Sequence, residues 1–320
     1  MAWRHFHTIA TLATPVALPV ERLDGRLHGS ETPVTMTFAG APETADFVAG
    51  ALMTTTHRMR VGSLRTPLAL RSDAFDTLCA DGDFAVGEVP PLWNALLPAA
   101  TELRMPAWVS QEIHADDGSP LLLPAPLLKE VNRLCRRERY TVEFSTDPAL
   151  VRRFHAELYR PYVMGRFGAG VILVDEARFL AVSCAMTLAI LSDGPVWVAG
   201  MLFRQQGTRL DLGWFGSSSV PVRPGASEVL DARVIERAIA GGVRRVVMGH
   251  SRPSLADGVV RYKSRFGAHI LPTRFPQRVI GLRIQRHSAA LASALNAARF
   301  VVFRDGRPKA YEWPLAGAMP

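Results

Sequence analysis

Several short segments alternate apolar and polar residues, and this period of two predicts β-strands. The clearest are Val34–Phe38, Ala107–Ile113 and Tyr140–Phe144. A hairpin is predicted where two strand-like runs flank the turn sequence at Gly207. These runs are Pro195–Phe203 and Thr208–Trp214.

Other segments space their apolar residues three and four apart, which predicts helices. The predicted helices are Ala45–Met53, Leu127–Arg137, Ala149–Tyr159, Val229–Ala240 and Ser288–Ala298. Asp147-Pro148 is a typical helix start, and we expect the helix after it to end near Pro161.

A buried strand at Val243–Met248 follows the helix 229–240, and we expect the sequence Gly249–Pro253 to form a loop after it. Strand-like segments follow the last helix at Phe300–Phe303 and Ala310–Trp313. This order predicts a mixed α/β fold rather than repeated βαβ units. The sequence contains no GxGxxG after a strand, no P-loop and no HExxH, which disfavours a doubly wound dinucleotide-binding fold.

With 320 residues and 48% hydrophobic content, the chain is long enough for two domains. No run of about eighteen uncharged apolar residues occurs, so we expect a soluble protein without a membrane span. Cys79, Cys135 and Cys184 are odd in number and widely spaced, which fits a reducing cytoplasm and shows no metal-ligand spacing.

The formal net charge of +8 favours an anionic partner, either a phosphate-bearing substrate or RNA. On the predicted helix 127–137, Lys129 and Arg133 lie near Arg136 or Arg137, because residues three and four apart are neighbours on a helix. This basic side is either a solvated helix face or an anion-contacting one.

A phosphate site is indicated where a loop enters the helix 229–240. Arg223, Gly225 and Ser227 stand there, and the first N–H groups of a helix attract phosphate. Arg223 adds a guanidinium that binds phosphate through two hydrogen bonds. The alternative is that Ser227 only caps the helix.

Proton transfer needs a group that titrates near neutrality, and His250 is the first candidate. Asp257 and Glu228 are the carboxylate alternatives. A structural histidine held by backbone groups is the competing interpretation for His250. Lys263 is either a point charge for a phosphate or a surface lysine.

Two segments resemble known proteins. Gly241–Pro253 and then Tyr262–Ala268 resemble the end of the GNAT-like domain in Fem-type transferases, the peptidoglycan-bridge aminoacyltransferase-like and exopolysaccharide-associated proteins. Upstream, Phe154-His155, Tyr159, Pro161-Tyr162 and Arg166–Gly168 resemble the helix and loop that open this domain. The resemblance covers about residues 140–272 and is much weaker before them.

The resemblance implies a GNAT-like fold in two halves, the first degenerate. It implies a degenerate half at 1–139, a transferase domain at 140–275 and a helix-strand extension at 276–320 that packs on the core. It also implies an acyl- or aminoacyl-transferase that moves an acyl group from a CoA thioester or aminoacyl-tRNA to an amine or hydroxyl acceptor, with no bound cofactor.

By the same resemblance, Lys263 contacts a phosphate-bearing substrate and Arg166 lines the acceptor cleft. Tyr162, Tyr262 and Arg252 belong to the matched segments, and we expect them to contact substrate too.

The sequence departs from the family in one respect. The Arg/Gln-x-x-Gly-x-Gly/Ala pyrophosphate loop is replaced by Arg223-Pro-Gly-Ala-Ser227, which argues against acetyl-CoA and leaves a larger donor open. The alternative function is a non-catalytic GNAT-fold protein that binds RNA or a nucleotide-linked ligand. We expect a small-molecule or nucleotide-linked acceptor and tRNA as a partner, but the sequence identifies neither the donor nor the acceptor, nor the oligomeric state.

Overall fold

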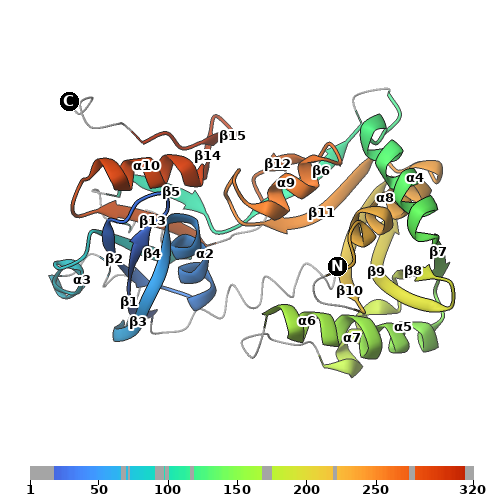
Figure 1. Ribbon diagram of the computed structural model, residues 1–320, viewed down its shortest axis with the longest axis horizontal. Helices are drawn as coiled ribbons and strands as arrows, with labels where there is room; N and C mark the ends of the chain where they lie inside the picture. Colours follow the sequence, from blue (N-terminus) through green and yellow to red (C-terminus); the bar gives the residue numbers. More distant parts are fainter. Residues whose placement is uncertain are drawn as a thin grey trace. The chain divides into compact units, whose positions relative to one another are not determined.

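The computed structural model describes most of the chain (Figure 1). The described residues are 18–65, 70, 73–90, 97, 101–115, 119–167, 175–218, 222–273 and 278–313. Among them, no helix is both long enough and apolar enough to cross a membrane.

Contacts divide the chain into two compact units. The first contains residues 1–109, 250–261 and 270–320, and the second contains residues 110–249 and 262–269. These boundaries differ from the expected division at 139 and 275, because residues 110–139 join the second unit and the C-terminal residues join the first. The boundary falls inside strands and a helix rather than in a linker.

The first unit contains a mixed six-stranded sheet among its described residues, in the order β3-β1-β2-β4-β13-β5. Its strands are β1 (Leu18–Leu27), β2 (Pro33–Ala39), β3 (Met53–Leu64), β4 (Phe84–Val89), β5 (Leu103–Pro106) and β13 (Val279–Ile284). The β2–β4 pair is parallel, whereas β1 pairs antiparallel with both of its neighbours. Strand β2 confirms the prediction for 34–38.

Each face of this sheet buries a separate apolar cluster. On one face lie α2 (Pro42–Leu52) and α10 (Ala289–Ala298), whose apolar sides share a core with Phe84 and Val86. The opposite cluster includes Ala85 and packs against α3 (Asp73–Cys79).

The C-terminal part of the first unit adds a two-stranded ribbon. Strands β14 (Val301–Arg304) and β15 (Arg307–Ala310) form it, so the second strand ends where the sequence predicted it to begin. Trp313 lies in the same core as α2 and α10.

The second unit is built on a seven-stranded sheet, counted over the described residues, in the order β12-β6-β11-β10-β9-β8-β7. The strands are β6 (Val109–His114), β7 (Tyr140–Ser145), β8 (Thr187–Asp193), β9 (Val196–Gln206), β10 (Arg209–Ser217), β11 (Arg245–Ser251) and β12 (His269–Leu271). Strands β9 and β10 form the predicted hairpin. Strand β11 extends through His250 to Ser251, so the prediction of a loop from Gly249 was wrong.

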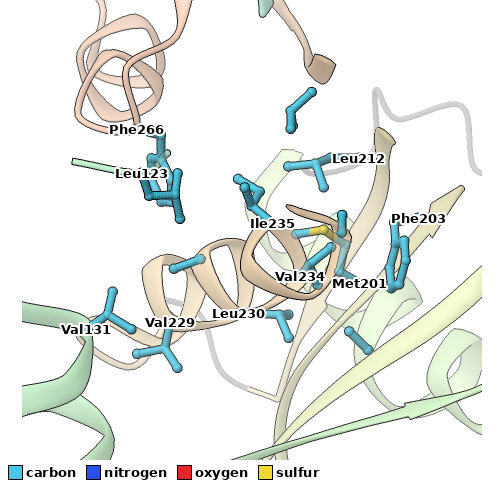
Figure 2. Packing of buried hydrophobic residues seen from close by; sticks show 14 of the residues in the cluster. Leu123, Val131, Met201, Phe203, Leu212, Val229, Leu230, Val234, Ile235 and Phe266 are labelled. Atoms are coloured by element: carbon cyan, nitrogen blue, oxygen red, sulfur yellow. The ribbon is translucent and has the colours of Figure 1, made fainter. Parts of the chain in front are cut away.

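Helices cover both faces of this sheet (Figure 1). On one face α4 (Ala125–Glu138) and α8 (Ala226–Ala240) pack over a large apolar cluster, part of which Figure 2 shows around Ile235 and Phe203. On the other face lie α5 (Pro148–Phe154), η3 (His155–Tyr159), α6 (Arg160–Phe167) and α7 (Glu176–Ser183). Adjacent residues of β8 pack on opposite faces of the sheet: Ala189 and Leu191 face α8, whereas Leu188 and Ile190 face α5. The mixed α/β fold class is thus confirmed.

The helix that was expected to end near Pro161 continues past it. It passes through η3, a π-helical turn in which the Arg160 N–H bonds the carbonyl of His155. Because proline has no N–H to donate and its ring crowds the preceding turn, a wider turn just before Pro161 lets the helix continue into α6. Arg166 and Tyr162 therefore lie on a helix and not on a loop.

Candidate active site

Strands β10 and β11 pair as parallel neighbours over only three residues each. The register joins Arg209–Asp211 with Arg245–Val247 and ends there, although β10 continues to Ser217. Within the described residues, the pairing with β11 does not extend to Leu212 and beyond, so this edge of β10 carries backbone N–H and C=O groups that β11 does not cover. An extended ligand can add to such an edge as a strand does.

A β-bulge explains why β10 leaves its neighbour. In the pairing with β9, Leu212 is opposite Phe203 and Phe215 is opposite Met201, so β10 holds one extra residue. A bulge bends its strand and increases the local twist. Gly213 permits the bend, because a Cβ there would overlap the Leu202 carbonyl oxygen.

Helix α8 begins shortly after β10 ends, and its N-terminus holds the three predicted phosphate-binding residues. Gly225 is the N-cap with φ 75°, and a Cβ on it would lie 2.6 Å from Leu134 Cδ1. The alternative interpretation of Ser227 was wrong, since no side chain caps this helix. Arg223 forms an ion pair of 3.0 Å with Asp193, and both side chains are partly exposed.

The predicted substrate residues Tyr262 and Lys263 lie against the same helix, in a buried polar cluster. The Tyr262 hydroxyl donates to Asp231 Oδ2 at 2.6 Å and also contacts the Ser227 hydroxyl. Lys263 is buried, with only 8% of its surface exposed, and its positive charge acts on Asp231. The interpretation of Lys263 as a surface lysine was therefore wrong.

This cluster shifts the titration of its members. Burial raises the pKa of Asp231 to about 6, against opposing effects of the Tyr262 hydrogen bond and the Lys263 charge. Burial and the adjacent Asp231 carboxylate hold the pKa of Tyr262 well above its usual value of 10.0. The phenol therefore keeps its proton near neutral pH.

Glu228, a candidate base, stands in the first turn of α8 and is already engaged. Its carboxylate accepts from Arg265 at 2.7 and 3.3 Å. The Glu228 side chain is buried while that of Arg265 is 55% exposed. The pair joins the segment after Tyr262 to α8 and places a guanidinium at the surface near the helix N-terminus.

Arg166, expected to line the acceptor cleft, and Tyr162, expected to contact substrate, lie beside the half of β10 that follows the bulge. The Arg166 guanidinium donates to the Tyr162 hydroxyl at 2.5 Å. The Tyr162 ring meets Phe215 edge to face, with ring centroids 5.3 Å apart. This contact ties α6 to the part of β10 that has left β11.

The remaining candidates, His250, Arg252 and Asp257, belong to the first unit. Asp257 caps the first turn of α9 (Gly258–Ser264) by accepting from the N–H groups of Val259 and Val260 at 2.8 and 2.9 Å. The Asp257 carboxylate therefore has a structural role as a helix cap.

Arg252 is likewise engaged within the first unit. Its guanidinium donates to the Glu43 carbonyl at 2.8 Å and stacks over the Trp108 ring at 3.9 Å. These contacts occupy the group that was predicted to bind substrate.

The structure thus gathers Arg223, Gly225, Ser227, Glu228, Tyr262 and Lys263 around the start of α8. Sequence reasoning missed Asp231, because one acidic residue in an amphipathic helix gives no sign of its burial. Among the described residues, no group of three or more His, Cys, Asp or Glu side chains is placed to hold a metal ion.

No model of a protein family and no curated protein sequence matches this chain. Solved structures do match, including L-PGS from Bacillus licheniformis with 12% identity and a TM-score of 0.39 over 82% of this chain and 84% of that one. FemX matches with 11% identity and a TM-score of 0.39 over 82% of this chain and 88% of its own. A putative GNAT-family acetyltransferase from Novosphingobium aromaticivorans has 13% identity and a TM-score of 0.31 over 69% and 82%.

These matches are Fem-type and GNAT proteins, the group that the sequence resembles. Their identities and TM-scores are low, and the function proposed below rests on the chain's own residues.

Proposed function

We propose that the chain is an acyl- or aminoacyl-transferase whose donor binds along the open edge of β10. The main supporting observation is that, in the part of the chain that the structure describes, β10 pairs with β11 only as far as Asp211, shortly before the N-terminus of α8. An extended donor with amide groups fits this edge, because it hydrogen-bonds to the backbone as a neighbouring strand does.

The start of α8 supports a phosphate-bearing donor. Its N–H groups and helix dipole favour an anion, and the side chains of Arg223 and Arg265 are 44% and 55% exposed. Both arginines have a carboxylate partner, so a bound phosphate competes with Asp193 or Glu228 for them. CoA thioesters and aminoacyl-tRNA both carry phosphates within reach of such a site.

Direct transfer then follows from the placement of the donor carbonyl. The acceptor nitrogen or oxygen attacks the acyl carbon, and backbone N–H groups on the open edge of β10 stabilise the oxyanion. Collapse of the tetrahedral intermediate breaks the C–S bond of a thioester or the C–O bond of an aminoacyl ester. The Tyr262 phenol, protonated near neutral pH and held beside the start of α8, donates a proton to the departing sulfur or oxygen and is reprotonated with the proton that the acceptor releases.

The test is transfer of labelled acyl groups from acetyl-CoA, longer acyl-CoA and aminoacyl-tRNA by the purified full chain. Arg223→Ala should weaken donor use about tenfold, the value of one lost charge-assisted contact. Arg152→Ala is the control, because Arg152 on α5 is also an exposed, ion-paired arginine, with 62% of its side chain exposed against 44% for Arg223. Loss of transfer in both variants, or in neither, would count against the donor site.

A non-catalytic RNA-binding role is the second candidate, and the surface of α4 favours it. Lys129, Arg133 and Arg136 are all exposed on one side of this helix. RNA binding that weakens steeply with salt, in a protein without turnover, would select this role over the transferase.

A further inference from the structure

The ribbon of β14 and β15 in the first unit carries a group of basic side chains (Figure 1). Its members Arg304, Arg307 and Lys309 are all exposed. Within the described part of the chain, none of the three forms an ion pair, whereas Arg223 and Arg265 at the start of α8 each have a carboxylate partner. An anion that binds the ribbon therefore displaces no carboxylate.

The pairing of the two strands places these three side chains on one face of the ribbon. Arg304 lies directly opposite Arg307, and Val302 lies opposite Lys309. Directly opposed residues share a face, and so do residues two apart in one strand. Three positive charges therefore line a single face over a few residues.

The ribbon holds these charges on a defined backbone. Asp305 and Gly306 form its two-residue turn with φ 53° and 72°, the positive values that a type I′ hairpin turn requires. At the base, Val301 and Val302 are buried, and the Val301 N–H donates to the Pro253 carbonyl at 2.8 Å. The tip is thus exposed while its base is anchored in the first unit.

The Arg304–Arg307 pair is unfavourable for folding by itself. The Cα atoms of directly opposed residues in an antiparallel pair are about 5.5 Å apart or less. Like charges in such a pair repel each other. Asp305 at the turn forms no ion pair with either arginine in the part of the chain that the structure describes. An anion held between the two guanidinium groups would remove the repulsion, and the guanidinium fork matches phosphate.

Two features favour a nucleic-acid backbone over other anionic partners. The exposed residues 304–309 include no large apolar side chain of the kind that enters a lipid surface. Pro308 has no N–H, so the backbone of β15 is poorly suited to adding a strand from an acidic peptide. Binding at the ribbon must therefore come from its charged side chains.

We propose that the β14–β15 ribbon binds the phosphate backbone of a nucleic acid through Arg304, Arg307 and Lys309. Contacts with phosphates carry no base information, so this binding does not depend on sequence. The ribbon is a different element from α4 and belongs to the other unit. The inference goes beyond the proposed acyl transfer, because the ribbon binds a backbone whether or not a donor lies at β10.

The test is fluorescence anisotropy of labelled unacylated tRNA and of a labelled mixed-sequence DNA duplex, titrated with the full chain at several salt concentrations. The ribbon variant replaces Arg304, Arg307 and Lys309 with glutamine. Its Kd should rise at least about tenfold, because charge-assisted contacts are lost. The slope of log K against log salt concentration should become shallower by about one unit for each side chain removed. The two probes show whether RNA or DNA is the better source of the phosphates.

The control variant removes the same charge elsewhere, from three exposed arginines that have carboxylate partners. It replaces Arg26, Arg152 and Arg286 with glutamine. Its Kd should stay within about threefold of the wild type, because distant surface charges are screened by salt. At low salt, Arg304→Gln alone should melt at the wild-type temperature or above it, since it removes the repulsion with Arg307.

Three results would overturn the inference: a wild type that binds neither probe, a ribbon variant with unchanged Kd, and equal weakening in the ribbon and control variants. Vesicles of phosphatidylglycerol and phosphatidylcholine test the lipid alternative. Vesicle binding that the ribbon variant loses while it keeps its affinity for both nucleic acids would assign the ribbon to a membrane surface instead. None of these results bears on acyl transfer from CoA thioesters, which the assay with Arg223→Ala tests separately.

Discussion

Tyr262 donates its hydroxyl hydrogen to Asp231 across 2.6 Å, and this bond joins the segment after β11 to the first turns of α8. Lys263, the next residue, brings its positive charge to the same carboxylate. The two residues that family resemblance assigns to substrate thus also hold the segment after β11 against α8. Loss of activity in a Tyr262 or Lys263 variant therefore needs a stability measurement beside it.

The first prediction concerns Asp231, whose pKa burial raises from 3.8 to about 6. Between these values the folded protein holds a proton that the unfolded chain has released, so this group lowers stability as pH rises from about 4 to about 6. Asp231→Asn removes the effect. Relative to the wild type, the variant should gain up to about 3 kcal/mol across this interval, at 1.36 kcal/mol per pKa unit.

Urea unfolding at steps between pH 4 and pH 7 measures this difference. Tyr262→Phe is the companion variant: it removes a hydrogen bond that favours the ionised carboxylate, so the pKa of Asp231 rises further and stability should go on falling to a higher pH than in the wild type. A difference between Asp231→Asn and wild type that stays constant with pH would contradict the prediction.

The second prediction tests whether Lys263 and Asp231 act as a pair. Lys263→Met keeps the aliphatic stem and leaves the buried carboxylate without its cation, which should cost about 3 kcal/mol at pH 7. In the background of Asp231→Asn the same substitution should cost at least about 1 kcal/mol less. Additive losses in this double-mutant cycle would show that Lys263 is held by other partners.

The third prediction concerns the bulge. Gly213→Ala forces a Cβ against the Leu202 carbonyl oxygen, which is backbone and cannot turn aside, so we expect a loss of about 1–3 kcal/mol. Gly50→Ala is the control, because Gly50 lies in α2 with no atom near its missing Cβ and should gain about 0.5–1 kcal/mol. Denaturant unfolding measures both, and equal effects would mean that the bulge tolerates a side chain.

The fourth prediction separates capping from catalysis at Asp257. Asp257→Ala should cost about 1 kcal/mol through the lost helix cap. Transfer per folded molecule should stay at the wild-type rate. A strong loss of transfer in a fully stable Asp257→Ala variant would contradict this prediction and indicate a catalytic role for Asp257.

Local patterns sufficed for most elements of the second unit. Asp147 begins a helix as predicted, since its side chain accepts from the Ala149 N–H, and the hairpin turn at Gly207 pairs β9 with β10. These features depend on a few neighbouring residues, which is why the sequence reveals them.

The less successful predictions concern features that depend on distant residues. The course of β11 through His250 is set by sheet pairing, and the passage of the helix beyond Pro161 depends on a π turn. The burial of Asp231 and Lys263 arises only when α8 and the segment after β11 meet. Such contacts between distant segments leave no local pattern, so the sequence predicts a phosphate site at the start of α8 but not the contacts of Asp231 with Tyr262 and Lys263.

The extra residue in β10 also reverses the face of the sheet toward which its even-numbered residues point. Before the bulge, Leu210 and Leu212 point toward α8; after it, the even-numbered Trp214 and Gly216 face η3 instead. If the same residues ran in regular alternation without the bulge, the Trp214 indole would point toward α8 and the Phe215 ring would stand opposite Gly200, where η3 now packs on the bare backbone of Gly216. The extra residue therefore changes which side of the sheet the following side chains face, and this lets one strand pack against both helical layers.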